Sequence, residues 1–163
     1  MDYGVLEVEI AGHLNIHLNK GVDIEEEKVD CQAIPEAEID YKKHYIKNKV
    51  TVAFSEEKAD PTNSTFAIGQ AVTVTFSILI ESKLLRSAKG IYPLAERIKK
   101  ILVGFRPTDC AKMWYTTQQF VDNERDIFKH VLEFQTKTFR VEDMDEKEPG
   151  EHDFKDLIIN EEL

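Results

Sequence analysis

Two histidines have the residue type and spacing of metal ligands. His13 and His17 are four residues apart, so a helix would place both imidazoles on one side, as a bound metal requires. Glu9 is available as a third ligand, but no Glu follows the first His, as one does in the HExxH motif of metalloproteases. The pair is more typical of a surface or half-buried helix face, and we expect no metal site.

The other candidates for catalysis are isolated from one another. Cys31 and Cys110 are far apart with no CxxC pattern, which indicates reduced thiols. Cys110 could act as a nucleophile only if the fold brought a histidine to it, and His130, among apolar residues, is typical of a hydrogen-bonded core histidine. No GxGxxG, GxxxxGK[ST] or GxSxG motif occurs. We therefore expect no enzyme and no cofactor.

Two further segments could bind an ion or a nucleic acid. DNERD, residues 122–126, begins like a calcium loop, but the sixth position is Ile127 where that loop needs glycine, so a turn is the better interpretation. Trp114, Tyr115 and Phe120 could stack on bases, but only Lys112 accompanies them as a cation. We expect no direct nucleic-acid binding.

The net charge of -10 is concentrated at the C-terminus. Residues 142–163 contain ten acidic side chains against Lys147 and Lys155, a net of -8, which leaves -2 for residues 1–141. This composition resists compact folding. We therefore expect one domain over 1–141 and an acidic, flexible tail over 142–163, which is either a solvated segment or an arm that docks its FKDLII stretch on a neighbour.

Hydropathy gives no sign of a membrane segment. No apolar run approaches the roughly 18 residues that span a bilayer, and the N-terminus lacks the features of a signal peptide. We expect the chain to be cytosolic when it is made.

Periodicity predicts the elements that carry these residues. The pattern of residues 91–105 predicts an amphipathic helix with Pro93 in its first turn, and we expect Gly104 to adopt the left-handed conformation after its last turn. Residues 50–54 and 72–80 alternate as strands, joined by a long polar loop, and residues 113–121 and 127–141 read as a long hairpin that projects from the domain.

The N-terminal third is harder to interpret. Leu6, Ile10, Leu14 and Leu18 form a helical stripe, although strand-like alternation is also present, and we favour a helix. VDCQAI, residues 29–34, reads as a short strand. Together the elements predict an α+β fold: a four-stranded antiparallel sheet with helices on one face and a long C-terminal hairpin. Thr73, Thr75, Thr136 and Thr138 are expected on its outer face.

A family resemblance rests on a stretch in the second half of the chain. It consists of YPLAERIKKILVGFRP (92–107), the strand MWYTTQQFV (113–121) and the long strand IFKHVLEFQTKTF (127–139). From about residue 50 to residue 141 the chain resembles the Mu-type tail-terminator proteins of contractile-tailed phages, with GFRP as the most recognisable element. It departs from them in TDCAKMWYT (108–116) and in the long loop between the first two major strands. These departures leave the type of particle open: a phage, a defective prophage or a headless injection particle.

The resemblance implies a structural role. Such proteins form hexameric rings on the completed tail tube, stop its polymerisation and provide the surface for head joining, without enzymatic activity or cofactor. The implied partners are further copies of the chain and the tube protein, with sheath and a head-completion or cap protein as further candidates. Alternatives are another head-tail connector or adaptor of a contractile particle, or a small ligand-binding or enzymatic α+β domain.

A ring requires one face of each subunit to fit a different face of the next. The candidate contacts are charged, polar or aromatic side chains of the helix, of the segment after it and of the hairpin: Arg97, Lys100, Arg106, Trp114, Lys129, Glu133, Gln135 and Lys137. Arg106 is included because an arginine can bind a neighbour's carboxylate in a fixed fork.

Overall fold

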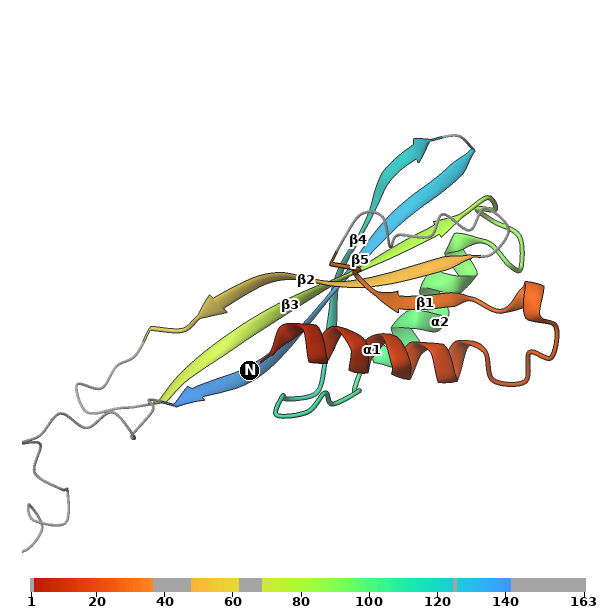
Figure 1. Cartoon of the computed structure of the whole chain (residues 1–163). Helices are drawn as coiled ribbons and strands as arrows, with labels where there is room; N and C mark the ends of the chain where they lie inside the picture. Colours follow the sequence, from red (N-terminus) through yellow and green to blue (C-terminus); the bar gives the residue numbers. More distant parts are fainter. Residues whose placement is uncertain (1, 37–47, 62–68, 125, 142–163) are drawn as a thin grey trace, which may run out of the picture.

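The structure is a computed structural model that describes residues 2–36, 48–61, 69–124 and 126–141. Its elements, in chain order, are α1 (Tyr3–Leu18), the 3-10 helix η1 (Glu25–Glu27), β1 (Asp30–Ala33), β2 (Lys49–Ala59), β3 (Gly69–Ser82), α2 (Ile91–Leu102), β4 (Trp114–Glu124) and β5 (Ile127–Val141). The strands form one sheet in the order β1-β2-β3-β5-β4 (Figure 1). The α+β class is confirmed, as are the two helices.

The prediction of four antiparallel strands is wrong in two respects. The sheet has five strands, and β1 pairs with β2 in parallel, through Asp30 to Ala33 opposite Lys49 to Val52. Parallel neighbours need a crossover of a dozen or more residues, which residues 34–48 are long enough to provide. The other pairings are antiparallel. The short strand predicted in VDCQAI is therefore an edge strand of the same sheet.

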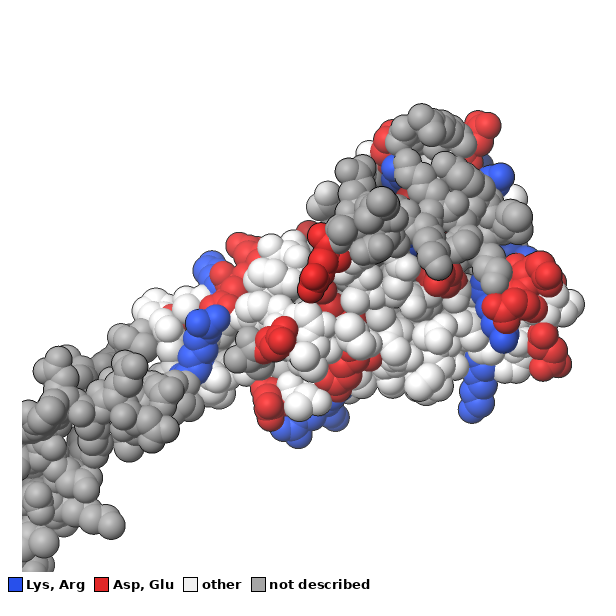
Figure 2. Space-filling view, viewed as in Figure 1, with Lys and Arg blue, Asp and Glu red and all other residues white. Residues whose placement is uncertain are grey.

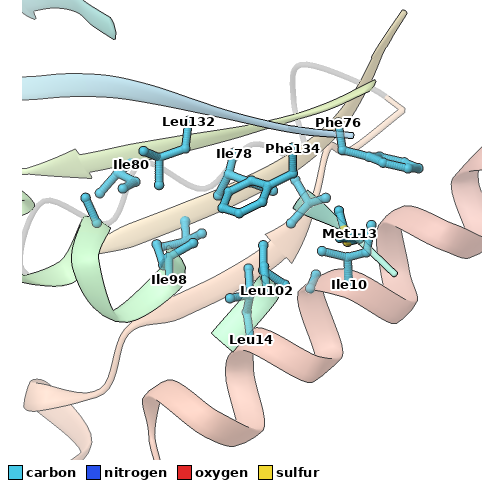
Figure 3. Packing of buried hydrophobic residues seen from close by; sticks show 14 of the residues in the cluster. Ile10, Leu14, Phe76, Ile78, Ile80, Ile98, Leu102, Met113, Leu132 and Phe134 are labelled. Carbon is cyan, nitrogen blue, oxygen red and sulfur yellow. The ribbon is translucent and has the colours of Figure 1, made fainter. Parts of the chain in front are cut away.

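The core lies between the sheet and the two helices. The predicted stripe of α1, from Leu6 to Leu18, is buried, as are Ile91, Leu94, Ile98 and Leu102 of α2. On the strands the buried side chains alternate, with Phe76 opposite Phe134 and Ile78 opposite Leu132 in the centre. Figure 3 shows these side chains meeting Ile10, Leu14, Ile98 and Leu102 of the helices.

Caps and glycines set the ends of both helices. The side chain of Asp2 accepts hydrogen bonds from the backbone N–H groups of Gly4 and Val5, at 2.9 and 3.3 Å, and so begins α1. After α2, Gly104 adopts φ 89°, and its N–H donates to the Met113 carbonyl oxygen at 2.9 Å. The left-handed conformation predicted for Gly104 is confirmed, and it turns the chain back towards β4.

Three strands extend further than predicted. β2 continues to Ala59 and β3 begins at Gly69, so much of the predicted polar loop is strand; residues 62–68 lie outside the described part. Similarly, β4 includes Asp122, Asn123 and Glu124, which pair with Lys129, Phe128 and Ile127. The pairing of Glu124 with Ile127 brings the two strands close to the turn, where Asp126 has φ 62°, a positive value that tight hairpin turns favour.

These extensions make the sheet longer than the helices that cover it. In Figure 1 the β4–β5 hairpin stands away from the body at one end, which confirms that it projects. At the opposite end β2, β3 and β5 continue past the N-terminus of α1. We call this second projection the arm, and it consists of Glu57–Asp60, Gly69–Thr73 and Lys137–Val141. The acidic tail, residues 142–163, lies outside the described residues.

Candidate assembly surfaces

A three-residue contact fixes the base of the arm to α1. Glu57 of β2 accepts a hydrogen bond from the Tyr3 hydroxyl and binds Arg140 of β5, with 2.6 Å between Arg140 Nη2 and Glu57 Oε2. The Tyr3 hydrogen bond and the Arg140 charge hold the pKa of the Glu57 carboxyl below its usual value. The Tyr3 ring also stacks on Phe54, with 4.2 Å between ring centroids. These contacts, the Tyr3–Glu57–Arg140 clasp, give the arm a defined direction.

The arm exposes an aromatic side chain. Phe139 is 72% exposed, the highest value among the described large hydrophobic residues. It pairs with Ala71 of β3 and follows Lys137, while Lys137 and Lys58 both face Thr73 from its two sides. Asp60 at the end of β2 offsets part of this positive charge. Figure 2 shows Lys and Arg side chains along this end of the molecule.

The opposite end carries a second exposed aromatic group. A bulge between Phe120 and Asp122 leaves Phe120 59% and Val121 53% exposed on β4. The Phe120 ring contacts His130 edge-on, with 5.5 Å between centroids, and Tyr92 at the start of α2 contacts the same imidazole at 5.7 Å. We call Tyr92, Phe120 and Val121 the hairpin patch. Its apolar groups lie where the hairpin leaves the body.

His130 is the buried floor of this patch. Its burial lowers the pKa of the imidazole, so the neutral form is favoured at neutral pH. Gln118 Nε2 lies 3.3 Å from His130 Nδ1 and donates to it in the tautomer that carries hydrogen on Nε2. The prediction that His130 is a hydrogen-bonded core residue is confirmed.

A third apolar surface lies on α1. Val5, Val8 and Ile16 are all exposed and, with Gly12 between them, follow one side of the helix away from the core. In Figure 2 the surface over the C-terminal half of α1 is mostly white, whereas acidic side chains lie over its N-terminal half. Scattered exposed apolar side chains are normal on protein surfaces, so we assign no partner to this side of α1.

The GFRP segment folds as a loop against α1. Phe105 stacks on His13, with 3.9 Å between ring centroids, and the Thr108 N–H donates to the Glu9 carboxylate. Arg106 Nε donates to the Cys110 carbonyl oxygen at 3.0 Å, so this arginine braces its own loop. The predicted contact of Arg106 with a neighbour's carboxylate stays a prediction.

The threonines expected on the outer face divide between the two faces. Thr136 and Thr138 are buried on the core face, because they share the alternation of Leu132 and Phe134. Their hydroxyls donate to the carbonyl oxygens of Ala111 and Asp109, at 2.7 and 2.9 Å. The prediction for these two was wrong: they attach the loop before β4 to β5. Thr75 lies on the outer face but is also buried.

The two predicted contacts on α2 have different surroundings. Arg97 Nη2 donates to the carbonyl oxygen of Leu18 at 2.6 Å and so ties α2 to the last turn of α1. Lys100 is exposed on the same helix. Arg97 thus has a structural task within the chain, whereas Lys100 is accessible to a partner.

The predicted residues of the hairpin lie on one face of the sheet. Trp114 of β4 is half-buried opposite Gln135 of β5, while Lys129, Glu133, Gln135 and Lys137 alternate with the buried side chains of β5. Gln135 Nε2 donates to Thr75 Oγ1 at 3.2 Å, and Lys129 also interacts within the chain. Of the four β5 residues, only Lys137 is strongly exposed. Their interface role stays a prediction.

Comparison with known proteins places this geometry in a family. Residues 26–153, more than half of the chain, match the model of the family described as Gp37 protein. The chain belongs to the Gp37 protein family. The matched range contains all five strands and α2, and α1 precedes it. In this Gp37 protein the arm and the hairpin patch therefore lie within the family's shared region, and the α1 surface lies outside it.

The remaining comparisons are less informative. A solved structure entitled "Virion of native gene transfer agent (GTA) particle" contains a similar chain, with 16% identity and a TM-score of 0.39 over 71% of this chain and 78% of that one. A likeness of this extent does not establish a shared function. No curated protein matches the chain.

Neither a metal centre nor a reactive thiol is evident in the described part. Those residues contain no group of three or more His, Cys, Asp or Glu that could hold a metal ion, and no helix among them is long and apolar enough to cross a bilayer. Both cysteines are free. Burial raises the pKa of Cys31 to about 12 and also raises that of Cys110, the opposite of what a nucleophilic thiol needs.

The most exposed apolar residues were missed from sequence. Phe139 follows the alternation of Lys137, opposite to that of Phe134, and this parity could have identified it as outward-facing. A helical projection of residues 3–18 would likewise separate Val5, Val8 and Ile16 from the core stripe. The candidate contacts predicted from sequence were mostly charged residues, among them three lysines.

Proposed function

We propose that this chain is a structural assembly protein of a phage-type particle. It forms a ring on the end of the tail tube, stops polymerisation of tube and sheath, and offers a surface for head joining or for a cap. The observation that carries this proposal is the pair of projections from one sheet, each with an exposed aromatic side chain. Exposed apolar groups at two separate ends are typical of a protein that contacts others on both sides.

The resemblance to tail terminators supports the same assignment. Its segments fold as one continuous unit: α2, the GFRP loop braced by Arg106, and the β4–β5 hairpin. The most recognisable motif therefore has a structural explanation, since Gly104 turns the chain and Phe105 packs on α1. In this proposal the chain has no catalytic chemistry and needs no cofactor. It is made in the cytoplasm and then becomes part of the particle.

A ring of identical copies needs two different surfaces on each subunit, related by rotation. A single sheet with projections at its two ends provides such a pair. Six copies, as in the resembling proteins, is the expected number. The tube protein is the expected partner, with sheath and a head-completion or cap protein next.

Light scattering coupled to size-exclusion chromatography tests the ring. We expect a closed oligomer at tens of micromolar, and electron microscopy should show it bound at one end of purified tail tubes. The same microscopy distinguishes the alternative, a head-tail connector or adaptor, which would leave tube ends bare. Tubes that keep elongating in the presence of an excess of the chain would contradict the terminator assignment.

A further inference from the structure

The hairpin patch and the arm are both exposed, and β5 holds them far apart. His130, beneath the hairpin patch, and Phe139 on the arm belong to the same strand, nine residues from each other. At about 3.3 Å per residue this separation is roughly 30 Å. Pairing of β5 with β3 along this whole length keeps the strand extended. The two aromatic ends of one copy therefore cannot cover each other.

We propose that the arm of one copy binds the hairpin patch of a second copy. Phe139 inserts against Tyr92 and Phe120, with His130 beneath them, and Val121 covers one side. The proposal deepens the proposed ring function, on which it rests, by naming the contact between successive subunits. Because the two surfaces differ, the contact is head-to-tail, and its repetition closes a ring when the rotation between copies allows it.

Aromatic geometry suits this contact. Tyr92 and Phe120 both meet His130 edge-on, at interplanar angles of 77° and 73°, so a third aromatic ring can join them in the same T-shaped manner. Tyr92 is 42% exposed and retains an accessible surface for it. Such aromatic anchors, surrounded by polar groups, are the residues that dominate protein interfaces.

The charged neighbours of the two ends are partly complementary. Lys58 and Lys137 lie beside Phe139, whereas Asp122 and Asp126 lie at the end of the hairpin. Asp60 near the arm, Lys129 opposite Asp122 and the acidic segment 142–163, which follows the arm in sequence, reduce this difference. We therefore assign most of the affinity to the apolar groups and the choice of orientation to the charges.

The clasp explains why the arm can present Phe139 to a neighbour. A free strand end would lose conformational entropy when it bound. Tyr3, Glu57 and Arg140 fix the arm to α1 before any partner arrives, so less of this cost remains.

Mixed cysteine crosslinking tests the contact. One preparation carries Ala71→Cys, which pairs with Phe139 across the arm and leaves that ring in place, and another, of different mass, carries Val121→Cys. After mixing and mild oxidation we expect a disulfide-linked heterodimer. Ala71→Cys mixed with Val8→Cys, an exposed position on α1, should give little product, and the wild-type chain controls for Cys31 and Cys110. Crosslinking to Val8→Cys instead, or to neither, would overturn the proposal.

Complementation gives an independent readout. Phe139→Ser and Phe120→Ser should each lose the oligomer, because each lacks one of the two surfaces, whereas Ile16→Ser should keep it. A mixture of the first two variants retains one intact arm and one intact hairpin patch, so it should form dimers and no rings. Circular dichroism checks that every variant is folded.

The outcomes separate this proposal from the ring function. If the wild-type chain is oligomeric and both aromatic variants remain so, the arm contact is wrong while the ring function stands. If the wild-type chain is a monomer even at several hundred micromolar, the contact is wrong as well. Binding of the chain to tube ends then decides the proposed function separately.

Discussion

Arg97 is a charged residue on an exposed helix face that acts within its own chain. Its guanidinium satisfies the carbonyl of Leu18, one of the last groups of α1 that lack a helical partner. Sequence alone placed Arg97 beside Lys100 as a candidate contact, because both follow the polar side of α2. Periodicity predicts which face of α2 carries Arg97. It does not predict that the end of α1 lies close enough for this long side chain to reach it.

Arg97→Met should therefore lower stability, whereas Lys100→Met should not. Loss of the hydrogen bond to Leu18 is expected to cost about 1 kcal/mol in free energy of unfolding, measured by urea denaturation. Lys100→Met, an exposed position on the same helix, is the matched control and should change stability by less than about 0.5 kcal/mol. Equal effects of the two variants would contradict the structural assignment of Arg97.

Two histidines, the buried His130 and the half-buried His13, predict a dependence of stability on pH. His130 and His13 both have a pKa lowered by burial, so the unfolded chain binds more protons than the folded chain as pH falls through the unfolded value. The contribution of the two histidines to stability is full well above the unfolded pKa of about 6.5 and is lost as pH falls through that value. The free energy of unfolding should fall between a pH of about 7.5 and one of about 5.5.

Variants at these positions isolate the effect. His130→Gln should reduce the slope of stability against pH, and the His13→Gln, His130→Gln double variant should reduce it further. Lys83→Gln, at an exposed position after β3, is the control, because His17 contacts His13 and helps to lower its pKa. An unchanged slope in the double variant would show that other groups determine the pH dependence.

At the scale of elements, the sequence predicted strands where one face is buried. Residues 72–80 alternate between apolar and polar side chains because α1 and α2 cover only one side of β3, and the prediction there is confirmed. Residues 56–59 and 69–71 lack this pattern, since no apolar helix face covers them and α1 reaches this part only through the hydrogen bond of Tyr3 to Glu57. Their pairing extends from the strands beside them. Alternation therefore could not find the arm.

Two other features were beyond sequence reasoning for similar physical reasons. The parallel placement of β1 depends on the path of residues 34–48 and on α1, which covers both β1 and β2, and four residues carry too little pattern to indicate direction. Thr136 and Thr138 look like surface residues by type, but the alternation of β5 turns them to the core, where loop carbonyls accept from them.

Two glycines in different elements should respond in opposite ways to alanine. Gly104 has φ 89°, where a Cβ is strained, so Gly104→Ala should cost on the order of 1 to 2 kcal/mol. Gly12 lies inside α1 with no atom within 4 Å of an added Cβ, so Gly12→Ala should stabilise by about 0.5 to 1 kcal/mol. Thermal or urea unfolding of both variants measures this, and destabilisation by Gly12→Ala would contradict the described α1.

At the scale of the whole molecule, one sheet connects two surfaces that face different neighbours. The body between them is closed by the two helices, and the projections are extensions of its hydrogen-bonded strands. Because the strands are continuous, their length determines the distance between the two surfaces, and therefore the distance between successive copies in the proposed ring. An insertion or deletion of two residues within β5 would change that spacing.

Charge reversal on the arm should weaken assembly and leave the fold intact. Lys137→Glu places a negative charge near the acidic hairpin end of the next copy and should shift the oligomer to smaller species in light scattering, more strongly at low salt. Lys83→Glu, at an exposed position after β3, is the matched control. Lys137 suits this test better than Lys129, which interacts within its own chain. Loss of the circular dichroism spectrum in Lys137→Glu would place this residue in the fold instead.

The exposure of Phe139 has an evolutionary consequence. Because this side chain contributes so little to the core, folding alone does not constrain which residue occupies its position. In a saturation library sorted first for solubility and then for particle formation, the first sort should accept almost any residue at this position. Substitutions of Phe139 that pass the first sort and fail the second would show that this side chain contacts a neighbouring molecule, even before that molecule is identified.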